Sequence, residues 1–390
     1  MNTQDRAGDD TIRITATRQG DAILGVEVHI PALAWMGGQV IGMTPAAATA
    51  HLLAHASHSP RAHACALEHA CALAVGEQAI AADDLEAQLA IERTLAAEMA
   101  DTHLRRLLID WPPQFGFEPR LNRFAEFHRQ LIAPSDAQTA FALGGEVLDL
   151  VAREMLAGFF NQIRMPHGIG EFIDRLNAGG SLSTVMNELI AMGASLPPRG
   201  GPTQLLGTLS AAAWVSSVGE WPDAEFVRHP TYAGAPAETG PLARHAPSPL
   251  VRLLLERGHR VSARLFAKAI DVADCASRMR HPYTDDVPPL IDAVQAAPGT
   301  GMARVATARG SLLCWVRIAS GLIADCVIVP AGAWNFHPDG AFCREALSGH
   351  EKGEDLEGTR RRLTVLALAL DPSIAHTVEV VERPAGKKRA

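Results

Sequence analysis

Cysteine and histidine side chains at helical spacing are the first residues in this chain that could do chemistry. Cys65 and His69 lie four residues apart in the stretch "SPRAHACALEHACALAVGEQA", so a helix there would place both on one face. A thiolate and an imidazole one turn apart can bind one metal ion or form an activated nucleophile pair. An Ala-rich helix can equally bury a cysteine and keep a histidine at its edge, and the spacing alone favours this structural interpretation.

A second group of possible metal ligands lies just upstream. His51, His55 and His58 follow an i, i+4, i+7 pattern, which suits zinc or nickel when the residues share a helix face. We expect an exposed helix face here. The sequence contains no glycine-rich phosphate loop, no GxSxG and no HExxH, so common motifs identify no reaction.

Composition and charge describe the setting of these residues. The chain has 390 residues, 47% of them hydrophobic, and a formal net charge of -8. This composition is ordinary for a globular protein, and the negative charge argues against nucleic acid as a partner. No segment has the 18 or so uninterrupted apolar residues of a membrane span, and the N-terminus is polar, so we predict no membrane span and a cytoplasmic location. The six cysteines form no CxxC pair and are expected to be small buried hydrophobes.

Two pairs of β-rich runs predict antiparallel hairpins. The first, "IRITATRQGDAILGVEVHI", turns around residues 19–21, and the second, "SLLCWVRIASGLIADCVIVP", turns at residues 319–321. Alanine-rich and leucine-rich stretches with helical spacing predict the helices between and around them, at residues 45–57, 61–80, 83–109, 136–160, 202–218 and 248–279.

The remaining segments complete the expected organisation. The stretch "RHPTYAGAPAETGPLARHAPSP" predicts a long surface loop, and "RRLTVLALALDP" predicts a strand or a helix. We therefore expect one α+β domain, mainly α, over residues 1–380, with a long-helix core and short antiparallel β hairpins. The tail, residues 381–390, which ends in "RPAGKKRA", is predicted to be disordered.

Three separated segments together resemble the large subunit of nickel-iron hydrogenases. The longest, "ATARGSLLCWVRIASGLIADCVIVPAGAWNFHPDGAFCREALSG" at residues 306–349, is similar to that family's "APRGxLxHW…DGxIxxYxxxxPTTWNxxPRD" block. The other two are similar to the family's motifs RxCxxCxxxH and DPCxxC, whose four thiolates hold a nickel and an iron. The resemblance implies a nickel-iron hydrogenase large-subunit-like fold, in which the two ends of the chain meet at one buried site.

The metal-binding motifs depart from the family pattern. In "RAHACALEH", Ala62 stands at the first cysteine, while Cys65 and His69 match the second cysteine and the histidine. In "DPSIAH", Ser373 and His376 stand at the two cysteines. Both positions that bind only nickel in the family are lost, and both positions that bridge nickel to iron keep side chains able to ligate. The resemblance therefore implies an Fe(CN)2CO group without nickel, with Cys65 as anchoring thiolate and His376 as second iron ligand.

Further departures concern the surroundings of the metal. Arg309 matches the family arginine that hydrogen-bonds a cyanide ligand of the iron, and His69 is expected to orient the site. The stretch "VIGMTP", where the family places a proton-transferring glutamate, contains no acid, so no catalytic residue is expected. Glu379 occupies the slot of the histidine that marks maturation cleavage in the family, so no processing is expected. Whether Ser373 takes part in binding stays open.

These segments are together similar to the HupK or HoxV type of hydrogenase maturation protein. That resemblance implies a non-catalytic scaffold that holds Fe(CN)2CO and passes it to the nickel-iron hydrogenase large subunit precursor, in company with HypC-type and HypD-type maturation proteins. The alternatives are an enzyme with unusual ligands, a nickel-handling chaperone that uses His51, His55 and His58, and a metal-free mimic that holds maturation partners. Replacing Cys65 by Ala separates them, because the scaffold predicts a large loss of hydrogenase maturation and the mimic predicts none.

Overall fold

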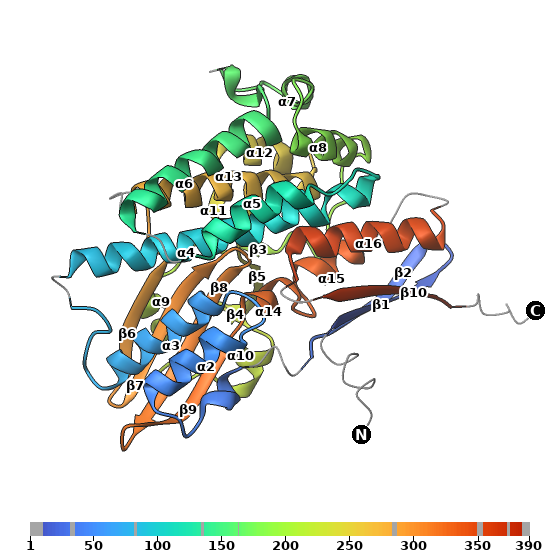
Figure 1. Cartoon of the computed structure of the whole chain (residues 1–390). Coiled ribbons are helices and arrows are strands. Elements are labelled where there is room, and N and C mark those ends of the chain that lie inside the picture. The colour runs from blue at the N-terminus through green and yellow to red at the C-terminus, as the bar shows by residue number, and fades with distance from the viewer. Residues whose placement is uncertain are drawn as a thin grey trace, which may run out of the picture.

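The long helix α13 (Arg260–Arg280) is the centre of the helical part of the molecule. The computed structural model of the chain describes residues 11–31, 36–81, 84–133, 136–162, 164–282, 287–348, 354–372 and 375–383. Most of α13 is buried, because other helices pack around it (Figure 1). These include α4 (Leu85–Arg105), α6 (Ala137–Asp149), α8 (Ser181–Ala191), α11 (Pro241–His245), α12 (Pro249–Glu256) and α16 (Leu356–Leu370).

A four-stranded antiparallel sheet lies below this helical body, in the order β6, β7, β8, β9 (Figure 1). Its strands are β6 (Ile291–Ala297), β7 (Thr300–Thr307), β8 (Gly310–Ala319) and β9 (Leu322–Val329). Helix α3 (Pro60–Ala74) packs across β6, β7 and β8. The closest approach is at Gly301, where a Cβ would collide with the backbone oxygen of Ala70, so only glycine fits there. This contact fixes the position of α3 on the sheet.

A second, three-stranded sheet joins the two ends of the described chain. Strand β10 (His376–Glu382) pairs in parallel with β1 (Ile12–Gln19), and β1 pairs antiparallel with β2 (Ala22–His29). Alternate residues of β1 are buried, as expected for a sheet with one covered face. Helices α15 (Ala341–Ala346) and α16 (Leu356–Leu370) cover that face.

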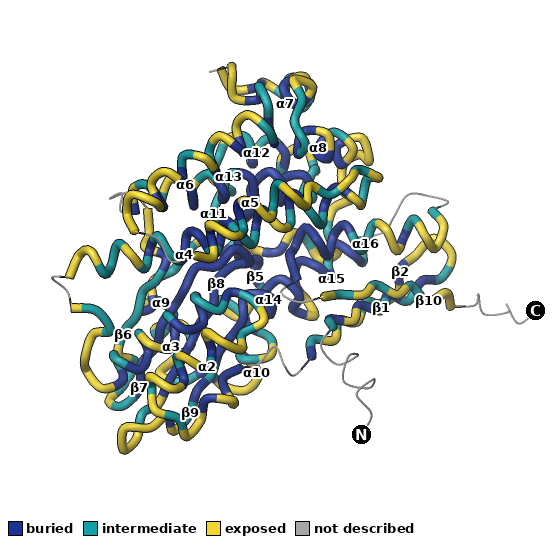
Figure 2. Tube along the Cα trace, in the orientation of Figure 1, coloured by how far each residue is buried: buried dark blue, intermediate teal, exposed yellow. Residues whose placement is uncertain are grey.

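The other elements complete the layers around these parts. In Figure 2 the buried stretches meet around α13, β5 and β8, whereas the outer turns of α2, α6 and α7 are exposed. The remaining elements are η2 (Gly37–Val40), α2 (Pro45–His55), the π-helix η3 (Arg106–Asp110), η4 (Pro112–Phe115), α5 (Leu121–Leu131), the π-helix η5 (Leu150–Met155), η6 (Phe159–Asn161), α7 (Ile169–Leu176), β3 (Gln204–Leu205), α9 (Ala211–Val218), α10 (Ala224–Arg228), β4 (Thr231–Tyr232), β5 (Ala235–Glu238) and α14 (Ala331–Asn335).

Most of the predicted elements are confirmed. Both predicted hairpins exist, as β1–β2 and β8–β9, and the fold is mainly helical with short antiparallel pairs. The six cysteines are all free, and all except the half-buried Cys65 are buried. None of the described helices has both the length and the apolar character needed to cross a membrane. The predicted tail, residues 381–390, is wrong at its start, because β10 continues through residue 380 to Glu382 and pairs there with β1. From residue 384 onward the tail lies outside the described residues, so its predicted disorder stays a prediction, as does the single domain.

Two further predictions about local structure are wrong, and one hairpin was missed. The stretch predicted as a surface loop forms β4, β5 and α11, and residues 237–243 are buried because Glu238 pairs with Arg264 of the core helix. Within residues 202–218 only α9 is helical, since β3 pairs with β5 before it. The hairpin of β6 and β7 was not expected from the sequence.

Candidate functional site

A buried carboxylate at the end of α16 joins four segments of the chain. Asp371 is 1% exposed and adopts φ 61°, a left-handed conformation that ends the helix. Its Oδ2 accepts a hydrogen bond from Lys268 Nζ at 2.7 Å, and its Oδ1 accepts one from Arg106 Nε at 2.8 Å. Arg309 Nε, from the β7–β8 turn, lies 3.3 Å from Oδ1. The "DP" of the C-terminal motif is thus the anchor of a charged cluster, which we call the Asp371 cluster.

The Asp371 cluster holds three cations around one carboxylate. Burial alone would raise the pKa of Asp371, but the charges of Lys268, Arg106 and Arg309 outweigh it and hold the pKa far below its usual range. Burial also lowers the pKa of Lys268, against the attraction of Asp371. Arg106 donates a further hydrogen bond to Asp110 at 2.7 Å. The cluster as a whole therefore presents an excess of positive charge.

A buried amide holds the β7–β8 turn beside the end of α16. Asn335 donates from Nδ2 to the carbonyl oxygens of Thr239 (3.2 Å), Leu370 (3.3 Å) and Arg309 (3.5 Å), and its Oδ1 accepts from Thr239 N at 3.0 Å. Gly310, at φ 135°, allows this approach, because a Cβ there would collide with the hydroxyl oxygen of Thr239. The role of Asn335 in joining three segments was not foreseen from the sequence.

A cavity of about 840 Å³ opens beside the Asp371 cluster. Segments from both ends of the chain and from α4 and α5 surround it, so it lies where the resemblance predicted that the two ends meet. The cavity is lined by Leu53, Ser57, His58, Ser59, Pro60, Arg61, Glu98, Asp101, Thr102, Arg105, Arg106, Asp110, His128, Leu131, Ile132, Arg309, Ala375 and His376.

The three acids of this cavity are each bound to a neighbour. Glu98 caps the N-terminus of α3, where it accepts hydrogen bonds from the backbone nitrogens of Arg61 (2.8 Å) and Ala62 (3.0 Å). Asp101 contacts His128 at 2.8 Å, and Asp110 contacts Arg106. Arg309 also lines the cavity, and its buried Nε and Nη1 atoms have no hydrogen-bond partner among the described residues. The Arg309 guanidinium is therefore a charged donor that these residues leave without a hydrogen bond.

The wall formed by the start of α3 contains two adjacent imidazoles. His63 is 1% exposed, and its Nδ1 lies 2.9 Å from the carbonyl oxygen of Ser59, while its Nε2 has no partner in the described part of the chain. The His58 ring meets it edge-on, with ring centroids 5.2 Å apart. Ser59 adopts φ 46°, so strained backbone occurs here as well as at Asp371. A small space of about 10 Å³ lies between these residues and Arg309.

The structure brings two of the four predicted site residues together. His376 begins β10 and lines the cavity with Arg309. Burial and the charge of Arg106 lower the pKa of His376, which favours the neutral imidazole that binds metals. Cys65 and His69 do not line it. Burial and the charges of Glu68 and Glu98 raise the pKa of the Cys65 thiol to about 12, and the Cys65 carbonyl oxygen lies 2.9 Å from His69 Nδ1.

The predicted ligand roles are therefore not decided by these positions. The structure records no contact between Cys65 and His376 among the described residues, and Ser373 lies outside them. The ligand roles of Cys65 and His376, and the orienting role of His69, stay predictions. The same part of the chain holds no group of three or more His, Cys, Asp or Glu side chains placed to bind a metal ion.

Of the three histidines predicted to share a helix face, His58 does not lie on the helix. His51 and His55 stack on α2 with ring centroids 4.3 Å apart. The helix ends at His55, because the chain turns at Ser59 to begin α3 at Pro60. His58 therefore leaves the helix face and lines the cavity instead.

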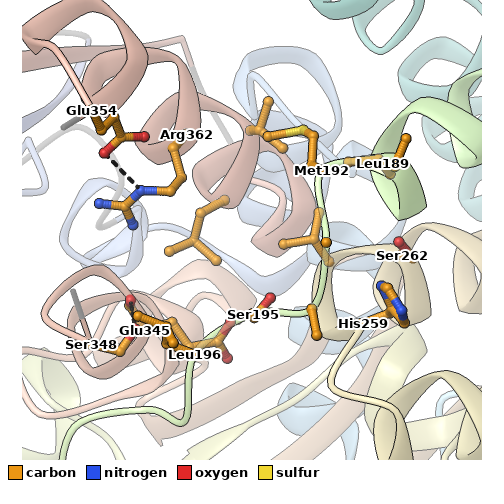
Figure 3. A pocket seen from close by; sticks show the side chains of 16 residues that line it. Leu189, Met192, Ser195, Leu196, His259, Ser262, Glu345, Ser348, Glu354 and Arg362 are labelled. Carbon is orange, nitrogen blue, oxygen red and sulfur yellow. Dashed lines mark hydrogen bonds and ion pairs between the residues drawn. The ribbon is translucent and has the colours of Figure 1, made fainter. Parts of the chain in front are cut away.

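A second cavity, of about 480 Å³, lies between α8, α13, α15 and α16 (Figure 3). Its wall is largely apolar and includes Leu189, Met192 and Leu196. Of its charged groups, Arg362 lies 3.4 Å from Glu354, as drawn in Figure 3. None of the predicted site residues lines it, and we place the candidate site at the larger cavity because His376 and Arg309 both line that one.

Charged residues of α13 were missed by the sequence analysis. Arg264, Lys268 and Asp271 follow an i, i+4, i+7 spacing and are all buried. Arg264 binds both Glu238 and Glu345, and Asp271 accepts hydrogen bonds from a group of three side chains, namely His103, Arg244 and His245. Charges at helical spacing inside an otherwise apolar helix were the available signal.

The fold is that of the nickel-iron hydrogenase large subunits. The [NiFeSe]-hydrogenase of Dm. baculatum matches 91% of this chain and 94% of its own with a TM-score of 0.57 and 15% identity. An NAD+-reducing [NiFe]-hydrogenase matches 90% of this chain and 93% of its own with a TM-score of 0.55 and 13% identity. At such identities the likeness defines the fold alone.

The sequence itself is similar to proteins named for hydrogenase formation. The hydrogenase expression/formation protein HoxV of Cupriavidus necator is 28% identical over 363 residues, which cover 87% of this chain and 88% of that protein. HupK of Azotobacter vinelandii is 31% identical over 149 residues, 38% of this chain and 40% of that protein. No family model matches the chain. The predicted resemblance to HupK-type and HoxV-type proteins is confirmed.

Proposed function

We propose that this protein is a hydrogenase maturation accessory protein, a non-catalytic scaffold that holds an Fe(CN)2CO group and passes it to a nickel-iron hydrogenase large subunit precursor. The names of its relatives support the maturation role, and its large-subunit fold supports a site that receives the same cargo as the enzyme. We further propose that it works in the cytoplasm with HypC-type and HypD-type proteins.

The observation that carries this proposal is the state of Arg309. Its Nε lies 3.3 Å from Asp371 Oδ1 as an ion pair, and neither Nε nor Nη1 has a hydrogen-bond partner in the described structure. A fixed guanidinium with an unused N–H suits the nitrogen end of a metal-bound cyanide, which is a strong hydrogen-bond acceptor. The excess positive charge of the Asp371 cluster favours an anionic group at the same place.

Nickel is not part of the proposal, because the sequence lacks the two thiols that bind it alone in the family. Ala62 and Ser373 stand at those positions. In this proposal Cys65 and His376 are the predicted iron ligands, and His69 orients the site. Of these, His376 lies on the cavity wall, which supports its role.

The test is an infrared spectrum of the protein purified without oxygen from cells competent in hydrogenase maturation, with iron and nickel counted on the same sample. We expect cyanide and carbonyl stretching bands with iron and without nickel. Arg309→Lys keeps the positive charge but removes the planar donors, so it should shift or weaken the cyanide bands. Arg304→Lys is the matched control, since Arg304 is also buried but binds the carbonyls of Pro289 and Leu290.

Two results would contradict the scaffold. A folded protein without bands or iron that still binds a large subunit precursor would favour the metal-free mimic. Bound nickel that is lost in His51→Ala would favour a nickel-handling chaperone, because His51 and His55 still stack on α2.

A further inference from the structure

The large cavity has an exposed rim that is partly apolar. Of the described residues that line the cavity, the exposed ones are Leu53, Ser57, Arg105, Ile132 and Ala375, which we call the cavity rim. Leu53 is 51% exposed and Ile132 is 50% exposed. Large apolar side chains that stay in water beside charged ones are typical of a surface that a protein partner covers.

The two apolar residues of the cavity rim are held in place by the fold. Arg61, near the start of α3, donates from Nη1 to the carbonyl oxygen of Leu131 at 3.3 Å and from Nη2 to that of Ile132. These hydrogen bonds join the end of α5 to α3. Leu53 follows Leu52, which is fully buried in the core and anchors α2. A partner therefore meets a pre-formed surface and loses little affinity to ordering it.

The charge of the cavity favours an acidic partner. Four arginines but only three acids line the cavity, and each of these acids is bound to a neighbour as described above. Arg105 is exposed, and its side chain makes no hydrogen bond or ion pair with the other described residues. Asp101 feels the charge of Arg105 only at a distance. A carboxylate on a partner would complement this unpaired guanidinium.

The cavity is much larger than the proposed cargo. At roughly 30 Å³ for each water-sized atom, an Fe(CN)2CO group takes about 200 Å³. The cavity has about 840 Å³. Most of its space therefore stays open when the cargo is bound, and a segment of another protein can enter through the cavity rim.

We propose that the cavity rim is the surface on which the large subunit precursor docks to take the cargo. The docking segment has an apolar side chain that packs on Leu53 and Ile132 and a carboxylate that pairs with Arg105. The proposal rests on the scaffold function. It names the precursor because, in that function, the cargo moves from this protein to the precursor, so the recipient must reach the cavity.

The first experiment measures binding of a purified large subunit precursor to the protein by biolayer interferometry. Leu53→Gln combined with Ile132→Gln should raise the Kd by about tenfold or more, since apolar contact area is lost. Both positions are exposed, so the variant should fold as the wild type does, which circular dichroism checks. Leu121→Gln is the matched control, because Leu121 is 60% exposed on α5 but does not line the cavity.

The second experiment tests the charge of Arg105. Arg105→Gln should weaken precursor binding and make it less sensitive to salt, because one exposed ion pair across the interface is removed. Arg129→Gln is the control, since Arg129 is also an exposed arginine but does not line the cavity. It should leave both the Kd and its salt dependence unchanged.

Each outcome decides between the two proposals. Weaker binding in the Leu53, Ile132 and Arg105 variants, with both controls unchanged, supports the inference. Precursor binding that is equal in all variants, or that is absent from a wild type carrying the cyanide bands, would overturn the inference and leave the scaffold standing. So would variants that lose binding only to a HypC-type protein assayed in parallel. A wild type that carries no bands and binds no precursor would overturn both.

Discussion

Replacing the charged carboxylate of Asp371 by a neutral amide should lower the free energy of unfolding far more than the small change in the side chain suggests. Asp371→Asn preserves the shape of the side chain, and asparagine tolerates the left-handed conformation at φ 61°. The change leaves the buried Lys268 and Arg309 without their carboxylate, and it places an amide N–H₂ against cations.

The size of the effect follows from the contacts. Pairs at 2.7, 2.8 and 3.3 Å are each worth about 5–6 kcal/mol of gross attraction at an effective dielectric constant of about 20. The cost of burying the charges offsets most of this, so removing one partner of a buried pair costs about 3–5 kcal/mol. We expect Asp371→Asn to lower the free energy of unfolding by that amount at pH 7.

The pH dependence gives an independent check. The pKa of Asp371 is lowered in the folded protein, so its contribution is complete above the unfolded pKa and declines as the pH falls below it. The difference between wild type and Asp371→Asn should therefore narrow by about 1 kcal/mol between pH 5 and pH 3, because the unfolded carboxyl titrates near 3.9. The Asp371→Asn variant has no carboxyl group at this position, so its stability lacks this part of the pH dependence.

Urea unfolding followed by circular dichroism measures both the loss in the free energy of unfolding at pH 7 and the change of this loss between pH 5 and pH 3. Asp110→Asn is the control, since Asp110 also pairs with Arg106 but is 24% exposed. It should cost about 1 kcal/mol or less. The reasoning is refuted if Asp371→Asn costs no more than Asp110→Asn, or if the difference does not narrow at low pH.

Two further predictions concern the surroundings of the site. Gly310→Ala should destabilise the protein by about 3 kcal/mol or more, because it combines a strained backbone with a collision at Thr239. Gly321→Ala, in an open hairpin turn, should cost only about 1–2 kcal/mol in the same urea assay, and equal losses would refute the collision. Iodoacetamide should label Cys65 slowly at pH 8, since a thiol with its pKa raised to about 12 is almost fully protonated. Mass spectrometry should show labelling that speeds up as the pH rises, and fast labelling of the folded protein at pH 8 would contradict the burial.

The sequence predicted elements well where local chemistry determines them. Turn residues marked the β1–β2 and β8–β9 hairpins, and helical spacing marked α3, α4 and α13. The hairpin of β6 and β7 was missed because its strands are rich in Ala and Gly. Its small residues are explained by α3, which approaches β7 at Gly301. The β-strand propensity of a segment does not reflect such a contact, because the contact is made with a distant part of the chain.

The site was predictable only in part, for a similar reason. The resemblance identified Arg309 and the "DP" pair from their motifs. Lys268 and Arg106 escaped notice because they lie 103 and 265 residues from Asp371 in the chain. His58 was assigned to a helix stripe, since spacing alone did not reveal that α2 ends three residues earlier.

Because β1 pairs with β10, the three-stranded sheet cannot be completed until both strands have been synthesised. Ile12 N donates to the Ala375 carbonyl at 2.9 Å, and Ile12 lies opposite His376 in the sheet. Strand β1 is the central strand of this sheet, so it must wait for β10 to leave the ribosome before it gains its second neighbour. Closing a loop of this length is entropically costly and slow, so the cavity forms late in folding. A chain without β10 lacks the wall that carries His376, so in the proposed scaffold the cargo site cannot be completed before β10 has paired with β1.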